Sequence, residues 1–215
     1  MIINIRDVPE SKYVNTMMFL TETGSNYEKY MSDYHPEIRI GSAMLYSNVF
    51  IKMLGLLGSS EGKSFIEIGC GPAYFLHALK KMGAEVYGLD MNENGGNQQK
   101  YGVNFALKNI LEFPDDAVLS PQDLFPQSRV KKFDALLTRD FLEKYLYFGM
   151  QGFSEEDVEK MLKMTRNLSD LQIHETGLNT SLLRGIDVGK LGYDVLDFEE
   201  TYHPNCDLHV LKVKT

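Results

Sequence analysis

The sequence is poor in cysteine, in basic residues and in long apolar runs, and each shortage excludes a class of protein. Its two cysteines, Cys70 and Cys206, stand far apart in a chain of 215 residues. Two are too few for a disulfide framework, and they lack the paired spacing of a metal site. The five histidines are also scattered, so no metal site is expected. This use of cysteine favours a reducing, cytoplasmic setting.

Basic residues are outnumbered, with 22 Lys and Arg against 30 Asp and Glu and a formal net charge of −8. Binding of a phosphate backbone depends on clustered Lys and Arg, so nucleic acid is not expected as a partner. No apolar run reaches the roughly 20 residues of a membrane-spanning helix. The N-terminal MIINIRDVPESKY is acidic and polar where a secretory signal is apolar. Neither membrane insertion nor export is expected.

What the chain does contain is a regular alternation of short apolar strands and helices. Strands are predicted at SFIEI, EVYGL, VNFAL, FDALL and residues 171–174, and helices at residues 72–82, 94–101, 141–148 and 154–166. Repeated βαβ units build a parallel sheet with right-handed crossovers and helices on both faces. The last two strands, GYDVLDFEETY and DLHVLKVK, are separated by HPNC alone, so they form a hairpin and are antiparallel.

The beginning of the chain has a different pattern. Residues 1–62 are predicted to form a small helical N-terminal cap, which ends in an apolar lead-in helix at 42–57 and a GSSEG break. Residues 63–215 form the α/β domain. At this length the two parts are expected to make one structural unit.

The stretch FIEIGCGPAYFLHALKKMGAEVYGLD, residues 65–90, has an acidic residue on each side of a Gly-x-Gly pair. Gly69 and Gly71 fall between a strand and a helix, where backbone N–H groups can bind an anion. Asp90 ends the second strand, where its carboxylate can accept hydrogen bonds from both hydroxyls of a ribose. The pattern therefore predicts an adenosine-type ligand.

A dinucleotide fits this loop poorly. Tyr74 stands where the dinucleotide fingerprint has its third glycine, and Glu67 would repel a diphosphate. Glu67 would attract a cation instead. S-adenosylmethionine combines an adenosine, a carboxylate and positive charges, so the loop amides suit its carboxylate, Glu67 its ammonium and Asp90 its ribose.

The motifs FIEIGCGPAYFL and VYGLDMNE resemble motifs I and II of the class I S-adenosylmethionine-dependent methyltransferases, and FDALLTRDFLEKY is similar to the family's segment after the third crossover. The resemblance implies a Rossmann-like seven-stranded sheet of order 3-2-1-4-5-7-6 with strand 7 antiparallel. It also implies a set of cofactor contacts: the backbone of Gly69, Cys70 and Gly71 with the methionine part, Met91 with the adenine face, Asn109 and Ile110 with the adenine edge, and Thr138 beneath the sulfonium.

The sequence departs from the family pattern at two places. Ala73 replaces a frequent third glycine, and Asn109 stands where the family often has Asp. Alanine is small and asparagine can still bind the adenine amino group through its carbonyl oxygen, so a retuned affinity is expected rather than a lost one.

The resemblance implies methyl transfer to an O or N atom of an acceptor by in-line displacement, with S-adenosylhomocysteine as the product. The acidic composition and compact cap favour a small molecule held in a closed pocket. His174 ends the fifth strand and is the preferred general base, because histidine titrates near neutral pH. Tyr27 and Tyr30 in the cap, and Arg139 after the fourth strand, are predicted to bind the acceptor.

Several alternatives stay open. His174 can be an ordinary hydrogen-bonded histidine, the tyrosines can pack in the core or in a lid, and Arg139 can form a salt bridge with Asp140, Glu143 or another surface acid. The acceptor can be a protein side chain, bound in an extended groove. The chain can also be a non-catalytic partner subunit, although the intact Glu67 and Asp90 argue against a decayed cofactor site.

Overall fold

The computed structural model describes residues 57, 60–71, 73–93, 96–139, 141–143, 145–146, 150–177, 181–200 and 206–214. The predicted cap, with Tyr27 and Tyr30, lies outside the described residues apart from Leu57 and residues 60–62. Among the helices in the described ranges, none is long and apolar enough to cross a membrane.

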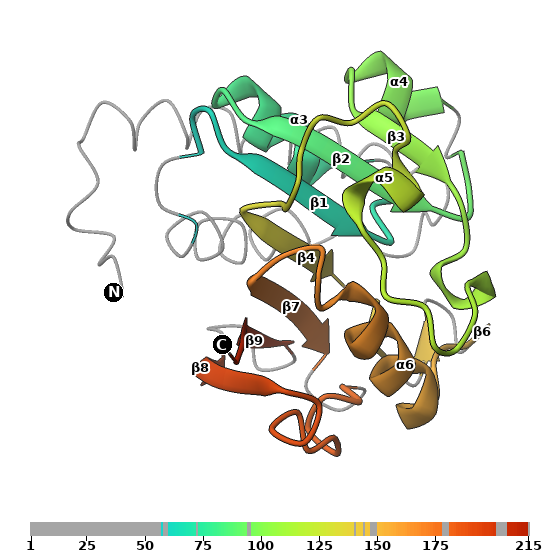
Figure 1. Cartoon of the computed structure of the whole chain (residues 1–215), viewed down its shortest axis with the longest axis vertical. Helices are drawn as coiled ribbons and strands as arrows, with labels where there is room; N and C mark the ends of the chain where they lie inside the picture. The colour runs from blue at the N-terminus through green and yellow to red at the C-terminus, as the bar shows by residue number, and fades with distance from the viewer. Residues whose placement is uncertain are drawn as a thin grey trace, which may run out of the picture.

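The first half of the domain is a run of parallel strands and short helices (Figure 1). Its elements are β1 (Ser64–Ile68), α3 (Tyr74–Lys81), β2 (Glu85–Asp90), α4 (Asn97–Lys100) and β3 (Asn104–Leu107). Every residue of β1 is buried, as expected of a central strand covered on both faces. β2 pairs in parallel with both β1 and β3. The strands predicted from the glycine-containing stretch are therefore confirmed.

The second half begins with the short helices η3 (Ile110–Glu112) and α5 (Pro121–Leu124), followed by β4 (Ala135–Arg139). It continues with α6 (Glu155–Thr165), β7 (Leu171–Gly177), β8 (Tyr193–Glu200) and β9 (Cys206–Val213). Ser154 caps α6, because its hydroxyl accepts a hydrogen bond from the Asp157 N–H while the Asp157 carboxylate accepts one from the Ser154 N–H. The predicted helix 154–166 is thus confirmed.

The sheet has the order β3-β2-β1-β4-β7-β9-β8. Counted along the chain, these seven strands have the predicted order 3-2-1-4-5-7-6. β9 runs antiparallel to both β7 and β8, so the predicted terminal hairpin is also confirmed.

The predicted helix at 141–148 is wrong. This segment contains β5 (Tyr145–Leu146), which pairs antiparallel with β6 (Met150–Gln151). Just before β5 the backbone is bound by distant residues, since Leu142 O accepts from Leu182 N and Glu143 O accepts from Phe153 N. These tertiary hydrogen bonds hold the chain extended, and tertiary contacts of this kind override local helix preference.

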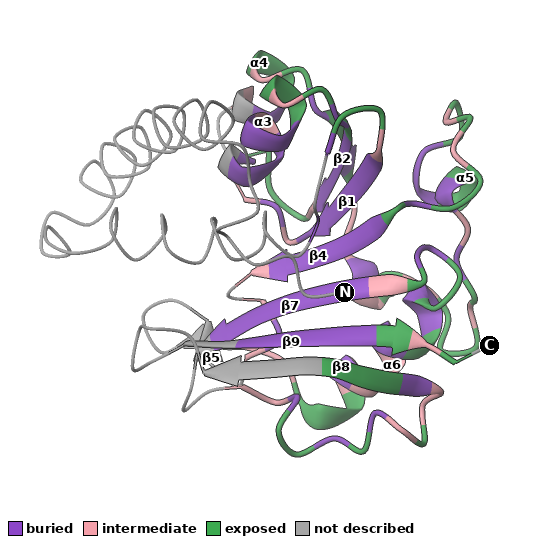
Figure 2. Cartoon of the chain, turned by 90° about the vertical axis from the view of Figure 1, so that its left-hand side faces the viewer, coloured by how far each residue is buried: buried purple, intermediate pink, exposed green. Residues whose placement is uncertain are grey.

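The hydrophobic core has two parts, one on each face of the sheet. Ile66 and Leu136 belong to the cluster that includes Leu162 of α6, whereas Phe65 and Leu137 belong to the cluster that includes Phe75 of α3. Neighbouring residues of a strand point to opposite faces, which accounts for the division. Figure 2 shows the buried strands β1, β4 and β7 side by side in the middle of the sheet.

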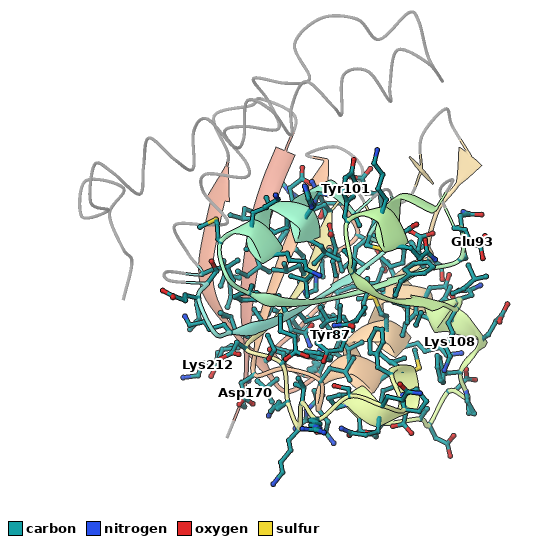
Figure 3. The ribbon with its side chains drawn as sticks, turned by 90° about the horizontal axis from the view of Figure 1, so that it is seen from above. Tyr87, Glu93, Tyr101, Lys108, Asp170 and Lys212 are labelled. Atoms are coloured by element: carbon teal, nitrogen blue, oxygen red, sulfur yellow. The ribbon has the colours of Figure 1, made fainter. Side chains whose placement is uncertain are left out.

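On the face of the sheet that α6 covers, aromatic side chains pack around Tyr87 of β2. Tyr87 lies within the body of the domain in Figure 3 and packs against Phe125 and Phe133, with ring centroids 4.9 and 5.0 Å away. Offset and edge contacts of this kind add stability beyond simple burial. They join β2 to the segment that leads into β4.

Candidate functional site

The candidate site lies where the parallel strands β1, β2 and β4 end. Glu67 and the glycine loop stand at the end of β1, Asp90 ends β2, and Arg139 ends β4. Since β1 pairs in parallel with both β2 and β4, these residues share one edge of the sheet (Figure 1). This edge is the place where ligands bind in open α/β folds.

The loop after β1 depends on left-handed backbone conformations, with φ of +71° at Gly69 and +48° at Gly71. The N–H groups of Gly69 and Cys70 donate to Leu89 O, at 2.8 and 3.2 Å. The Gly71 N–H donates to Asp90. All three amides are therefore engaged within the protein, and the structure does not support the expectation that they bind a carboxylate. A side chain added at Gly71 would meet nothing within 4 Å among the described residues, so this glycine borders open space.

Asp90 joins the glycine loop to the chain after β2. Its Oδ2 accepts from Gly71 N and its Oδ1 from Asn92 N, each at 2.8 Å. Burial raises the pKa of the Asp90 carboxyl, although these backbone hydrogen bonds oppose the rise. Each carboxylate oxygen has a second lone pair, so Asp90 can still accept hydrogen bonds from ribose hydroxyls. The neighbouring Met91 is 64% exposed and presents an apolar surface beside it.

Glu67 and Arg139 form an ion pair within the site. Glu67 is fully buried, and its Oε1 lies 2.7 Å from Arg139 Nε. Its Oε2 has no hydrogen-bond partner among the described residues. The Arg139 guanidinium lies 5.3 Å from the ring centroid of Phe75. Arg139 is therefore at the predicted ammonium end of the cofactor, and its salt-bridge partner is the buried Glu67 in place of the surface acid that was considered.

His174 is fully buried on the other face of the sheet. Its Nδ1 lies 2.9 Å from Thr138 Oγ1 and its Nε2 lies 3.2 Å from Gln172 Oε1. Burial lowers the pKa of His174 to about 3. The strand alternation puts Thr138 and His174 on the α6 face, whereas Glu67 and Arg139 lie on the α3 face. The structure therefore argues against His174 as the general base, and it encloses Thr138 in the same polar cluster.

The remaining predicted cofactor residues are mostly enclosed. The Asn109 side chain accepts from Leu111 N at 3.0 Å and so caps η3. Ile110 is 1% exposed and belongs to the core. Cys70 is buried against Gly88, where an added Cβ would be 2.8 Å from the Cys70 Sγ. Burial raises the pKa of the Cys70 thiol well above its usual range, so it is a packing residue.

Two residues of the site were missed in the sequence. Gln98 of α4 is fully buried, and its Nε2 donates to Gly71 O at 2.7 Å and to Asn92 O at 3.3 Å. Phe141 lies against Gly69, where an added Cβ would be 2.2 Å from the ring. Phe141 lies in the FDALLTRDFLEKY segment and Gln98 in the predicted helix 94–101, but neither pattern shows that its side chain reaches the glycine loop.

No group of three or more His, Cys, Asp or Glu side chains that could hold a metal ion occurs in the described ranges. That finding concerns those ranges alone. The polar groups that do gather at the sheet edge are Glu67, Asp90, Gln98 and Arg139, which suit an organic ligand with hydroxyl and cationic groups.

Comparison with solved structures shows that the fold is the one found in S-adenosylmethionine-dependent methyltransferases. One similar structure is magnesium protoporphyrin IX methyltransferase from Synechocystis PCC 6803 with bound S-adenosylmethionine, at 16% identity and a TM-score of 0.58, covering 90% of this chain and 97% of that one. A TehB-like methyltransferase from Corynebacterium glutamicum ATCC 13032 matches at 11% identity and a TM-score of 0.57, over 90% of this chain and 98% of that one.

A methyltransferase from Aquifex aeolicus matches at 15% identity and a TM-score of 0.53, covering 76% of this chain and 89% of that one. No protein-family model matches the sequence, and the search of curated proteins finds no match. At these identities the structural matches define the fold, and the function has to be argued from the site.

Proposed function

We propose that the chain is an S-adenosylmethionine-dependent methyltransferase that acts on an O or N atom of a small molecule. The observation that carries the proposal is the pair of carboxylates beside the glycine loop. Glu67 is buried and one of its oxygens has no partner among the described residues, and the half-buried Asp90 accepts a hydrogen bond from Gly71. These two carboxylates fit the cofactor, because their oxygens can accept hydrogen bonds from an ammonium and from ribose hydroxyls next to the open side of Gly71.

In this proposal each residue binds or orients a different part of the ligand. Asp90 accepts hydrogen bonds from the ribose, the exposed Met91 covers the adenine, and Glu67 binds the ammonium. The bound cofactor supplies a methyl group already activated by the sulfonium charge. The protein's contribution is then to hold the acceptor in line with that methyl and to exclude water.

The residues on the acceptor side are also proposed. Tyr27 and Tyr30 of the N-terminal cap are candidates for holding the acceptor, while His174 is not assigned the role of base because of its burial and low pKa. The net charge of −8 favours a small molecule over a nucleic acid. The low cysteine content favours a cytoplasmic location.

Calorimetric titration of the full chain with S-adenosylmethionine and S-adenosylhomocysteine tests this function. We expect both to bind at one site with micromolar affinity, and Asp90→Ala to abolish the binding. Gly71→Val should do the same by filling the open space beside the loop. Gly62→Val is the matched control, because Gly62 also has positive φ and open surroundings but lies in the turn before β1.

Binding that survives in both Asp90→Ala and Gly71→Val would remove the cofactor from this position. If the folded wild-type protein binds neither compound, the methyltransferase proposal fails and the non-catalytic partner subunit takes its place. Circular dichroism of each variant separates a lost site from a lost fold.

A further inference from the structure

We propose that Arg139 is a positioning residue that holds Glu67 as a carboxylate, with one oxygen bound to Arg139 and the other, buried and without a partner among the described residues, left to bind the ammonium of the ligand. The inference rests on the proposed function, because it is the S-adenosylmethionine site that brings an ammonium group to Glu67. It gives Arg139 a role in binding the cofactor, where the sequence predicted one in binding the acceptor.

The sheet register brings the two residues together across 72 positions of sequence. Glu67 pairs with Leu137 of the neighbouring β4, and Arg139 is the next residue of β4 on the same face. The guanidinium is held from its other side by the ring of Phe75 in α3, at 5.3 Å from the centroid. The side chain of Arg139 is only 10% exposed, so solvent screens the pair weakly.

The charge on Glu67 needs this support. Burial raises the pKa of the Glu67 carboxyl, Arg139 lowers it through charge and hydrogen bonding, and the nearby Asp90 raises it. Among the described residues the Cys70 thiol also interacts with Glu67, and burial keeps it neutral by raising its pKa. Arg139 is therefore the cation that favours the ionised form of Glu67. A protonated Glu67 would bind an ammonium far less strongly, because the attraction between opposite charges would be lost.

The two oxygens of Glu67 have different surroundings. Oε1 receives the Arg139 Nε–H at 2.7 Å, while Oε2 is buried and has no partner among the described residues. A buried acceptor without a partner is destabilising, because it has lost its hydrogen bonds to water and gained none in return. A ligand ammonium would satisfy this oxygen with a charge-assisted hydrogen bond. This buried oxygen, which lacks a partner among the described residues, favours a cationic ligand independently of the ion pair.

Two probes isolate the contribution of Glu67. S-adenosylhomocysteine carries the ammonium, whereas 5′-deoxy-5′-methylthioadenosine keeps the adenosine and thioether but lacks the amino-acid part. We would measure the affinity of the full chain for both between pH 5.5 and 8 and follow the ratio of the two affinities. Protonation of Asp90 weakens binding of the ribose that both probes share, so this direct effect cancels from the ratio.

In the wild-type protein the ratio should fall as the pH falls, because Glu67 loses its charge. In Arg139→Gln the fall should move to higher pH, because the cation that opposes the rise in the Glu67 pKa is gone, and the ratio at pH 7 should drop about tenfold. Arg139→Lys should restore much of the wild-type profile, and Glu67→Gln should give a low ratio that is independent of pH. Arg129→Gln, at an exposed arginine before β4, removes the same charge and should leave the profile unchanged.

An Arg139→Gln profile identical to that of the wild type, or a higher ratio at pH 7, would overturn the inference while leaving the proposed function intact. The second outcome would mean that Arg139 competes with the ligand for Glu67. If neither probe binds the folded wild-type protein, both proposals fail. Should Arg139→Gln not fold, Arg139→Met, which also removes the charge, takes its place with the same expected profile and the same contrary outcome.

Discussion

The Asp90 carboxylate accepts a hydrogen bond from the Gly71 N–H, with 2.8 Å between Oδ2 and the nitrogen. The carbonyl of the same glycine accepts from Gln98 Nε2 at 2.7 Å. Both backbone polar atoms of Gly71 are thus bound by side chains, one from the end of β2 and one from α4. The loop that borders the proposed cofactor site is shaped by residues that follow it in the sequence.

Replacement of Gln98 tests this dependence. Gln98→Ala removes a fully buried side chain and its hydrogen bonds to the carbonyls of the half-buried Gly71 and the exposed Asn92, so we expect a loss of about 1–3 kcal/mol in the free energy of unfolding. The loosened loop should also weaken S-adenosylhomocysteine binding about tenfold. Urea denaturation and calorimetry measure the two effects.

Gln122 provides a matched control for Gln98. Its Nε2 also donates to two carbonyls, those of Ser128 and Val130, but the side chain is exposed and lies away from the glycine loop. Gln122→Ala should change neither stability nor affinity by much. Equal effects of the two substitutions would mean that Gln98 has no special connection with the site.

Ala73 has a left-handed backbone conformation, with φ 60° and ψ 30°, and it is the one non-glycine residue with positive φ among the described residues. This conformation costs about 1–2 kcal/mol for alanine. Ala73→Gly relieves that cost but loses a buried methyl worth about 0.8 kcal/mol and adds chain entropy to the unfolded state. We expect stability to stay within about 1 kcal/mol of the wild type.

Ala78 is the reference for this prediction, since it is equally buried but lies inside α3. Ala78→Gly loses a buried methyl and also helix propensity, so it should destabilise the protein by about 2 kcal/mol. Denaturation midpoints of the two variants give the comparison. A loss at Ala73 as large as that at Ala78 would show that the loop carries no backbone strain.

His174 should make the protein sensitive to acid. Its pKa is lowered from 6.5 to about 3 by burial, so the folded state favours the neutral ring. The contribution of the neutral His174 ring to the free energy of unfolding is fully present above pH 6.5 and is lost as the pH falls toward 3. Between pH 7 and pH 5 the loss is about 2 kcal/mol. We expect this part of the pH dependence to disappear in His174→Gln.

Urea denaturation of the wild type and of His174→Gln at pH 7 and pH 5 measures the effect. The difference between the two pH values is compared within each protein, so any cost of the substitution itself cancels. The same loss of stability in both proteins would mean that His174 is open to protonation in the folded state, and its role as a base would then deserve reconsideration.

The order of the sheet could be predicted because the relevant information is local. SFIEI, EVYGL and FDALL are short apolar runs separated by helix-forming segments, and HPNC leaves no room for a crossover. The segment 141–148 shows the limit of such reasoning. Its apolar residues fit a helix, yet its backbone is held by Leu182 and Phe153 in an arrangement that requires the finished fold.

The site could be predicted where a residue's place follows from the end of a strand. Glu67 and Asp90 stand beside the glycine loop as expected. The partner of each side chain could not be predicted, because Glu67 and Arg139 meet through the strand register and Gln98 reaches Gly71 from another element. The burial of His174 likewise depends on α6 and the strands around it.

Because β9 lies between β7 and β8, it determines the order in which the last strands can join the sheet. β8 comes earlier in the chain, but in the seven-stranded sheet it pairs with β9 alone, and β9 alone connects it to β7. A ribosome therefore releases β8 before the strand that attaches it has been made. Until then the outer edge of β7 has no neighbour, and it is completed when the hairpin, whose strands are close in sequence and pair quickly, docks as a unit.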